Sequence, residues 1–170
     1  NTHIYIRIKM KKLLLLFIAI LMLIPTHSEV SAQDRGDFKF GFRTGYYIRT
    51  KAYAIGIYGT YSITDWLNIE PGINYICKAN SSVDVYCDFH IPLEVATYWN
   101  VYPIVGVSVH DITSYGGKVD CWAGGLNLGV GGSYSINRRW QITGQVKWMG
   151  RLPQKHRSAV IISAGIDYNF

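Results

Sequence analysis

The chain has 170 residues, of which 49% are hydrophobic and only 16% are charged, and its formal net charge is +6. After residue 32 no apolar run reaches the roughly 20 residues that a transmembrane helix needs, so a membrane span there could only be made of β-strands. Residues 33–170 hold 13 basic and 10 acidic residues, a net charge of +3, and the basic residues are not clustered. The composition therefore excludes a nucleic-acid-binding surface, which needs clustered Lys and Arg.

The one long apolar run, Leu13–Pro25, predicts a secretory signal peptide. Lys11-Lys12 precede it, and the small residues of Val30-Ser31-Ala32 follow it, as a signal peptidase requires. We expect translation to start at Met10 and cleavage to follow Ala32, so that residues 1–32 are the signal peptide and 33–170 the mature domain. A retained anchor helix is the weaker alternative, because this run is too short to span a bilayer.

Residues 33–170 divide into eight segments in which large apolar residues alternate with small or polar ones. In chain order the segments are Asp37–Ile48, Tyr53–Ile63, Leu67–Tyr75, Val85–Thr97, Val101–Ile112, Trp122–Ile136, Trp140–Trp148 and Val160–Phe170. Alternation with a period of two is typical of β-strands, whose successive side chains point to opposite faces. The faces are clearest in the first segment, where Phe38, Phe40 and Phe42 alternate with Lys39 and Arg43. They are least distinct in the fifth, where both faces are partly apolar.

The charged residues of these strands fall on the face opposite the large apolar residues. They are Lys39, Arg43, Glu70, Asp88, His90, Glu94, Lys147 and Asp167, with His110 in the same phase. A membrane barrel presents its apolar face to lipid and its polar face to the lumen. The pattern therefore predicts that these side chains form a charge network inside a closed, antiparallel, eight-stranded up-and-down transmembrane β-barrel.

Turn lengths and aromatic positions support this interpretation. Short turns alternate with longer connectors, as in outer-membrane barrels. Aromatic residues fall at both ends of most strands, where the two membrane interfaces would lie. At the short-turn end these are Phe38, Tyr61, Trp66, Trp99, Tyr134, Trp140, Tyr168 and Phe170, and at the other end Tyr46, Tyr53, Tyr75, Trp122 and Trp148. Closure into a barrel would remove every edge strand, whose unpaired backbone groups could not form hydrogen bonds with lipid.

The C-terminal sequence Ser163-Ala164-Gly165-Ile166-Asp167-Tyr168-Asn169-Phe170 resembles the β-signal that the outer-membrane barrel-assembly machinery recognises. Its characteristic positions are Ser163, Gly165, Tyr168 and Phe170. Together with Ile69–Tyr75, Ile91-Pro92-Leu93 and the glycine-rich stretch Gly124–Gly132, it makes the chain similar to the small outer-membrane β-barrel domain family, which is PorT-like and related in shape to OmpX and the OmpA barrel. This resemblance implies a place in a Gram-negative outer membrane, and it implies no shared catalytic residues.

Three cysteines remain in the exported part of the chain. Cys77 and Cys87 would stand at the two bases of one loop, and a disulfide is possible if their Cα atoms come within about 7 Å. The alternative is that they are free thiols, and Cys121 would in either case be free or intermolecular. Metal-ligand spacings are absent from the sequence, so we expect neither a metal nor a cofactor.

An eight-stranded barrel is so narrow that its own side chains fill it. We therefore expect paired charges that plug and stiffen the lumen, and the alternative is a narrow gated pore for ions or protons. Any interaction outside the membrane would then depend on the loops Lys78–Asp84, Ile112–Cys121 and Gly150–Arg157, with aromatic tips such as Tyr86 and Tyr115. Structural, adhesion or partner-binding roles could all use such loops.

Two further alternatives remain open at this stage. Ser108 and His110, beside Asp111, loosely resemble the catalytic serine and histidine of barrel-type lipid A deacylases, although those enzymes have the reverse order, and His90 with Glu94 is an equally weak pair. A soluble lipocalin-like barrel would instead place the charges in water and the phenylalanines inside. We expect a non-catalytic monomer that contacts outer-membrane lipid and lipopolysaccharide and, during biogenesis, the assembly machinery, with no nucleic-acid partner.

Overall fold

The computed structural model describes residues 36–77, 82–113, 119–152 and 158–170, with side chains described outside 111–122 and 151–152. The predicted signal peptide and its cleavage site lie outside these ranges. The described strands are β1 Phe38–Tyr47, β2 Ala52–Thr64, β3 Leu67–Cys77, β4 Ser82–His90, β5 Leu93–Ala96, β6 Trp99–Thr113, β7 Val119–Ser135, β8 Trp140–Leu152 and β9 Ala159–Asn169. Within these ranges there is no helix long and apolar enough to cross a membrane.

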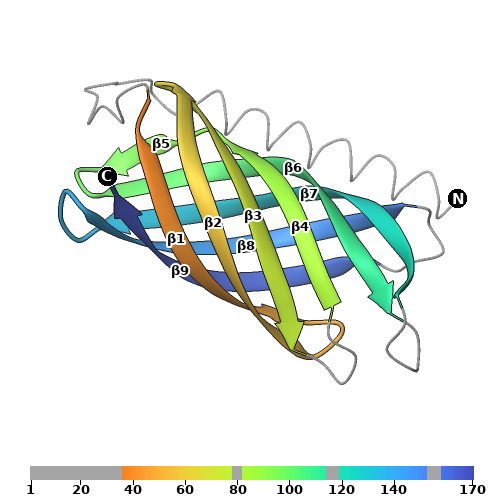
Figure 1. Cartoon of the computed structure of the whole chain (residues 1–170). Helices are drawn as coiled ribbons and strands as arrows, with labels where there is room; N and C mark the ends of the chain where they lie inside the picture. The colour runs from red at the N-terminus through yellow and green to blue at the C-terminus, as the bar shows by residue number, and fades with distance from the viewer. Residues whose placement is uncertain (1–35, 78–81, 114–118, 153–157) are drawn as a thin grey trace, which may run out of the picture.

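The strands form one closed antiparallel barrel (Figure 1). Neighbours in sequence pair with each other except β4 and β5, β1 pairs with β9 along nine residues, and β4 pairs with β6. β5 pairs with β6 and continues the course of β4 after a break at Ile91-Pro92. The predicted eight-stranded topology is therefore confirmed, and its fourth strand is divided where proline removes a backbone donor.

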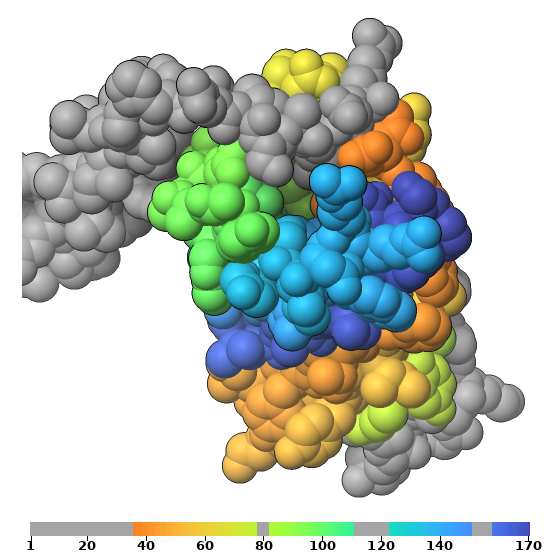
Figure 2. Space-filling view, turned by 90° about the vertical axis from the view of Figure 1, so that its left-hand side faces the viewer, coloured from red at the N-terminus to blue at the C-terminus, as the bar shows by residue number. Residues whose placement is uncertain are grey.

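The strand connections differ at the two ends of the barrel. The turns β2–β3, β5–β6 and β7–β8 need two to four residues and lie at the same end as the C-terminus (Figure 1). Figure 2 looks onto this short-turn end, where the β5–β6 region lies beside the β7–β8 turn, as the pairing of Trp99 with Tyr134 requires. At the opposite end β6 runs on to Thr113 and β7 begins at Val119, so both ends of the predicted loop Ile112–Cys121 are strand.

The outward face of the barrel is apolar and the inward face is largely polar. Phe42 is 60% exposed and its neighbour Arg43 only 6%, while Trp148 is 43% exposed and Lys147 only 3%. A soluble barrel would show the reverse, so the lipocalin-like alternative is wrong. Burying charge inside while exposing large aromatic and aliphatic side chains is favourable only where hydrocarbon surrounds the barrel.

Aromatic residues pack together at both ends of the outer surface. At the short-turn end the ring centroids of Trp140 and Tyr168 lie 5.1 Å apart, and those of Trp99 and Tyr134 lie 5.0 Å apart. At the other end the rings of Tyr46 and Tyr53 face each other across β1 and β2, also at 5.0 Å. These cross-strand pairs match the two interfacial girdles of a membrane barrel.

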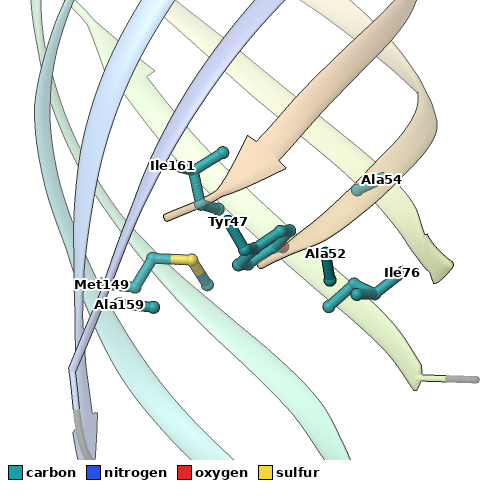
Figure 3. Packing of buried hydrophobic residues seen from close by; sticks show 7 residues of the cluster. All are labelled: Tyr47, Ala52, Ala54, Ile76, Met149, Ala159 and Ile161. Carbon is teal, nitrogen blue, oxygen red and sulfur yellow. The ribbon is translucent and has the colours of Figure 1, made fainter. Parts of the chain in front are cut away.

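The interior is not polar throughout. At the end opposite the short turns, seven buried side chains form an apolar cluster inside the barrel (Figure 3). They are Tyr47, Ala52, Ala54, Ile76, Met149, Ala159 and Ile161. The members come from five strands that are consecutive in the barrel, in the order β3, β2, β1, β9 and β8, and the Tyr47 hydroxyl extends the cluster to Asp84 on β4. We call it the apolar plug.

Candidate functional site: the charged interior

The centre of the interior is a bidentate ion pair between Arg43 on β1 and Glu70 on β3. Nη1 lies 2.6 Å from Oε1 and Nη2 lies 3.1 Å from Oε2. Both side chains are 3% exposed. The Thr60 hydroxyl donates a further hydrogen bond to Glu70 Oε2 at 3.4 Å. Two parallel charge-assisted bonds of this kind are among the strongest polar contacts in proteins, so the pair fixes the distance between β1 and β3.

Two tyrosines complete the surroundings of Arg43. The guanidinium lies 3.8 Å from the centroid of the Tyr58 ring, and Nη1 donates to the Tyr86 hydroxyl at 2.9 Å. Lys147 lies over the ring of Tyr86, with its Nζ 4.0 Å from the ring centroid. Tyr86 therefore separates the two buried cations. The prediction that it forms a loop tip is wrong, because β4 begins before it and its phase points it inward.

A second ion pair joins Lys147 on β8 to Asp88 on β4. Nζ lies 2.7 Å from Asp88 Oδ2, and Asn127 Nδ2 donates to Asp88 Oδ1 at 2.8 Å. The Ser108 hydroxyl in turn donates to Asn127 Oδ1 at 3.0 Å. This chain of contacts connects four strands across the lumen, and it satisfies both oxygens of a carboxylate that is 0% exposed.

The remaining predicted charges lie closer to the short-turn end. Asp167 on β9 accepts a hydrogen bond from the Tyr58 hydroxyl. Lys39 is half-buried and donates to Gln141 Oε1 at 3.1 Å. His90 stacks on the ring of Tyr102 at 4.7 Å, and its Nδ1 lies 3.8 Å from Glu70 Oε2. His90 is the link between the central ion pair and the short-turn mouth of the barrel.

A small polar cavity opens at this mouth. Space for water-sized molecules inside it measures about 30 Å³, enough for at least one water. Its lining consists of Lys39, Thr60, Asn68, Glu70, His90, Pro92, Asn100, Tyr102, Ser133, Gln141, Thr143 and Asp167. Lys39, Pro92 and Asn100 are half-exposed and form its rim. At its inner end His90 Nε2 is buried without a hydrogen-bond partner in the described structure.

Two acidic residues lie where the sequence did not place them. Glu94, which we expected in the lumen network, is exposed on β5. The pairing of β3 with β4 ends at His90, before the break at Ile91-Pro92, so β5 has no β3 strand beside it. Asp84, expected in a loop, is 2% exposed inside the barrel and accepts hydrogen bonds from Tyr47 and Asn74. Its even-numbered phase, shared with Asp88, was the signal that could have identified it.

Inward glycines make room for the inward tyrosines. In the strand register Gly41 faces Tyr58, Gly72 faces Tyr86 and Gly131 faces Tyr102. A Cβ atom added to any of these three glycines would overlap the opposing tyrosine ring. The large rings can therefore lie across the narrow lumen only because the partner strand offers no side chain at that position.

Glu70, Asp88 and His90 are the one group of the described residues whose ligand atoms lie close enough to hold a metal ion, all within 4.8 Å. The donor set does not fit that role. Arg43 binds both oxygens of Glu70, and Lys147 and Asn127 bind those of Asp88. A divalent ion would have to displace these partners and sit beside two buried cations, each of which would repel it by roughly 8 kcal/mol at a separation of 4 Å and an effective dielectric constant of about 20.

The hydrolase arrangement is also unfavourable. Ser108 and His110 both face the lumen and are buried, but the Ser108 hydroxyl gives its hydrogen bond to Asn127. Activation of a serine needs a hydrogen bond from this hydroxyl to a base. The side chain of Asp111 lies outside the described part. His90 lies beside Glu70, so the alternative pairing with Glu94 is wrong.

Of the two alternatives for Cys77 and Cys87, the disulfide is not formed. Both are free thiols. Cys87 pairs with Pro71 in the middle of the sheet, whereas Cys77 is the last residue of β3, six residues further along that strand. At about 3.3 Å per residue the two backbones are far beyond the roughly 7 Å that a disulfide can bridge. The side chain of Cys121 lies outside the described residues.

No family model and no curated protein matches the chain. Solved structures do match. The N-terminal β-barrel domain of Pseudomonas aeruginosa OprF is 15% identical with a TM-score of 0.70, covering 81% of this chain and 100% of that one. Neisserial surface protein A is 14% identical at 0.58, covering 81% and 98%. Ail, the attachment invasion locus protein of Yersinia pestis, is 9% identical at 0.54, covering 81% and 100%.

These likenesses, together with the closed barrel and its inverted polarity, define the class of protein. The chain has the fold of the small eight-stranded outer-membrane β-barrels. In outer-membrane barrels the short turns lie on the periplasmic side and the longer connectors on the extracellular side.

Proposed function

We propose that the protein is a non-catalytic, non-conducting outer-membrane barrel of a Gram-negative envelope, whose extracellular connectors serve a structural, adhesion or partner-binding role. The observation that supports this most is the interior, where two ion pairs, a set of tyrosines and the apolar plug fill the lumen. Buried charges of this kind are typically kept because they are paired, and each pair here has further hydrogen bonds.

An adhesion role is the form of this proposal that has the most specific support. The fold is similar to that of Ail, which has been solved both alone and in complex with the heparin analogue sucrose octasulfate. In this chain Arg49 and Lys51, on the connector between β1 and β2, are exposed at the extracellular end. Cations at this end would favour anionic partners such as lipopolysaccharide phosphates, through the electrostatic attraction that charge-assisted contacts provide.

Assembly of the barrel would use the C-terminal strand. Phe170 ends the chain, and β9, with Ser163, Gly165 and Tyr168, pairs with both β8 and β1. Because β9 closes the barrel, recognition of its sequence by the assembly machinery would couple binding of the chain to barrel closure. The PorT-like resemblance and the monomeric state belong to the same proposal.

Three measurements test the proposed function. Refolded protein should migrate differently in detergent gels before and after boiling, and it should produce no single-channel current in planar bilayers. Cells that lack the gene should then be compared for envelope integrity and for adherence to host-cell surfaces. Steady wild-type conductance would contradict the non-conducting interior, and unchanged envelope and adherence together would contradict both outward roles.

A further inference from the structure

The interior of the barrel differs sharply from one end to the other. The polar cavity opens at the periplasmic mouth and ends at His90 and Glu70. Beyond it lies the layer of ion pairs around Arg43 and Lys147. The apolar plug follows toward the extracellular end, with Tyr47 only four residues, or roughly 13 Å of strand, beyond Arg43.

The side chains of the apolar plug face one another across adjacent strands of a run of five neighbouring strands, β3-β2-β1-β9-β8. Tyr47 faces Ala52 on β2 and Ile161 on β9, Ala54 faces Ile76, and Met149 faces Ala159. Tyr47 is 1% exposed, Met149 2% and Ile161 4%. The Tyr47 hydroxyl also donates to Asp84 on β4, at 3.2 Å, which ties the cluster to the remaining wall.

We propose that the lumen is a blind well, open to water from the periplasm and sealed against the outside by the apolar plug, so that the plug and not the ion pairs makes the barrel impermeable. This inference rests on the non-conducting interior of the proposed function. An ion in an apolar constriction loses its hydration shell, and such constrictions exclude both ions and water by dewetting. Ion pairs, by contrast, can be hydrated once either partner moves.

The well has a chemical reason to hold water. His90 Nε2 is buried beside the cavity and lacks a partner in the described structure, and buried polar atoms almost always find one. A water that enters past Lys39 and Asn100 would reach this nitrogen. Among the seven plug side chains, Tyr47 has the one hydroxyl, and it donates to Asp84 Oδ2.

Conductance of three refolded proteins separates the two possible seals. Wild type and the variant Arg43→Ala/Glu70→Ala should both be silent in planar bilayers. The variant that also carries Met149→Ser/Ile161→Ser should conduct. Only protein that shows heat-modifiable migration is tested, and Lys147→Ala/Asp88→Ala replaces the first pair if it fails to refold.

The outcomes are distinct. Current through the wild type would overturn the proposed function itself. A silent wild type with a conducting Arg43→Ala/Glu70→Ala variant would leave that function standing and overturn the plug as the seal. A folded but silent four-residue variant would also overturn it, because removing the plug would then not open the barrel.

Thiol labelling provides a measurement that needs no current. In a background with Cys77, Cys87 and Cys121 changed to serine, Asn100→Cys at the cavity and Ala159→Cys in the plug form a matched pair. In detergent, where both ends are accessible, a small cationic methanethiosulfonate should label Asn100→Cys completely and leave Ala159→Cys unlabelled until the protein is unfolded. Labelling of the folded Ala159→Cys protein at a similar rate would refute the sealed well.

Discussion

The interior ion pair Arg43–Glu70 gives the sharpest energetic prediction. Replacing Arg43 with methionine would leave Glu70 buried and charged, with hydrogen bonds from the Thr60 hydroxyl at 3.4 Å and the Tyr86 hydroxyl at 3.5 Å and the imidazole of His90 at 3.8 Å. Removing one partner of a buried pair typically costs about 3–5 kcal/mol. We therefore expect Arg43→Met to lower the free energy of unfolding by that amount.

The double variant Arg43→Met/Glu70→Met should recover most of this loss, because apolar replacement of a whole buried pair is often neutral or stabilising. The difference between the single and double variants would be measured by urea unfolding of protein refolded in lipid vesicles, followed by tryptophan fluorescence. Arg49→Met is the matched control, since Arg49 is exposed and should change stability by no more than about 0.5 kcal/mol. Equal losses for Arg43→Met and Arg49→Met would refute a buried, energetically coupled pair.

Three further predictions concern other parts of the barrel. Gly131→Ala should lower the free energy of unfolding by about 1–3 kcal/mol, because the added Cβ would overlap the inward ring of Tyr102. Gly144→Ala is the control and should be neutral or slightly stabilising, because a Cβ there meets open space. Equal effects of the two variants in urea unfolding would contradict the glycine–tyrosine arrangement. Cys77 and Cys87 should both be alkylated by iodoacetamide in unfolded, unreduced protein, and mass spectrometry showing an intact bridge would disprove the free thiols. Deleting Phe170 should reduce the amount of barrel in the outer membrane of cells while refolding of the purified protein into detergent proceeds normally, and equal loss in both settings would indicate a purely structural role for this residue.

Much of the barrel followed from local pattern. The outward rows of Phe, Ile and Val and the inward phase of Arg43, Glu70, Asp88 and Lys147 were readable because side-chain direction in a strand depends only on its parity along the chain. Where parity continued past an expected strand end, as at Asp84 and Tyr86, the sequence contained the information and the assumed loop boundary concealed it.

Strand register and strand endings were decided by the tertiary structure. Whether Cys87 lies near Cys77 depends on which residue faces Pro71, and no local pattern specifies that pairing. Glu94 has the phase of a lumen residue, yet it is exposed because the neighbouring strand β3 pairs with β4 only as far as His90. Whether a side chain is buried in the lumen therefore depends on several strands being present at the same level of the barrel.

Alternation by itself determined that the strands have one face rich in charge and one free of it, a pattern that soluble barrels and membrane barrels share. The tertiary structure decided that the charged face is the inner one, because Arg43 and Lys147 are buried while Phe42 and Trp148 are exposed. Closure alone decided which buried groups touch: Arg43 meets Glu70 from 27 residues away, and Lys147 meets Asp88 from 59. The apolar plug likewise emerges only when five strands bring their few inward apolar residues to one level of the lumen, because a single strand contributes no more than two of them.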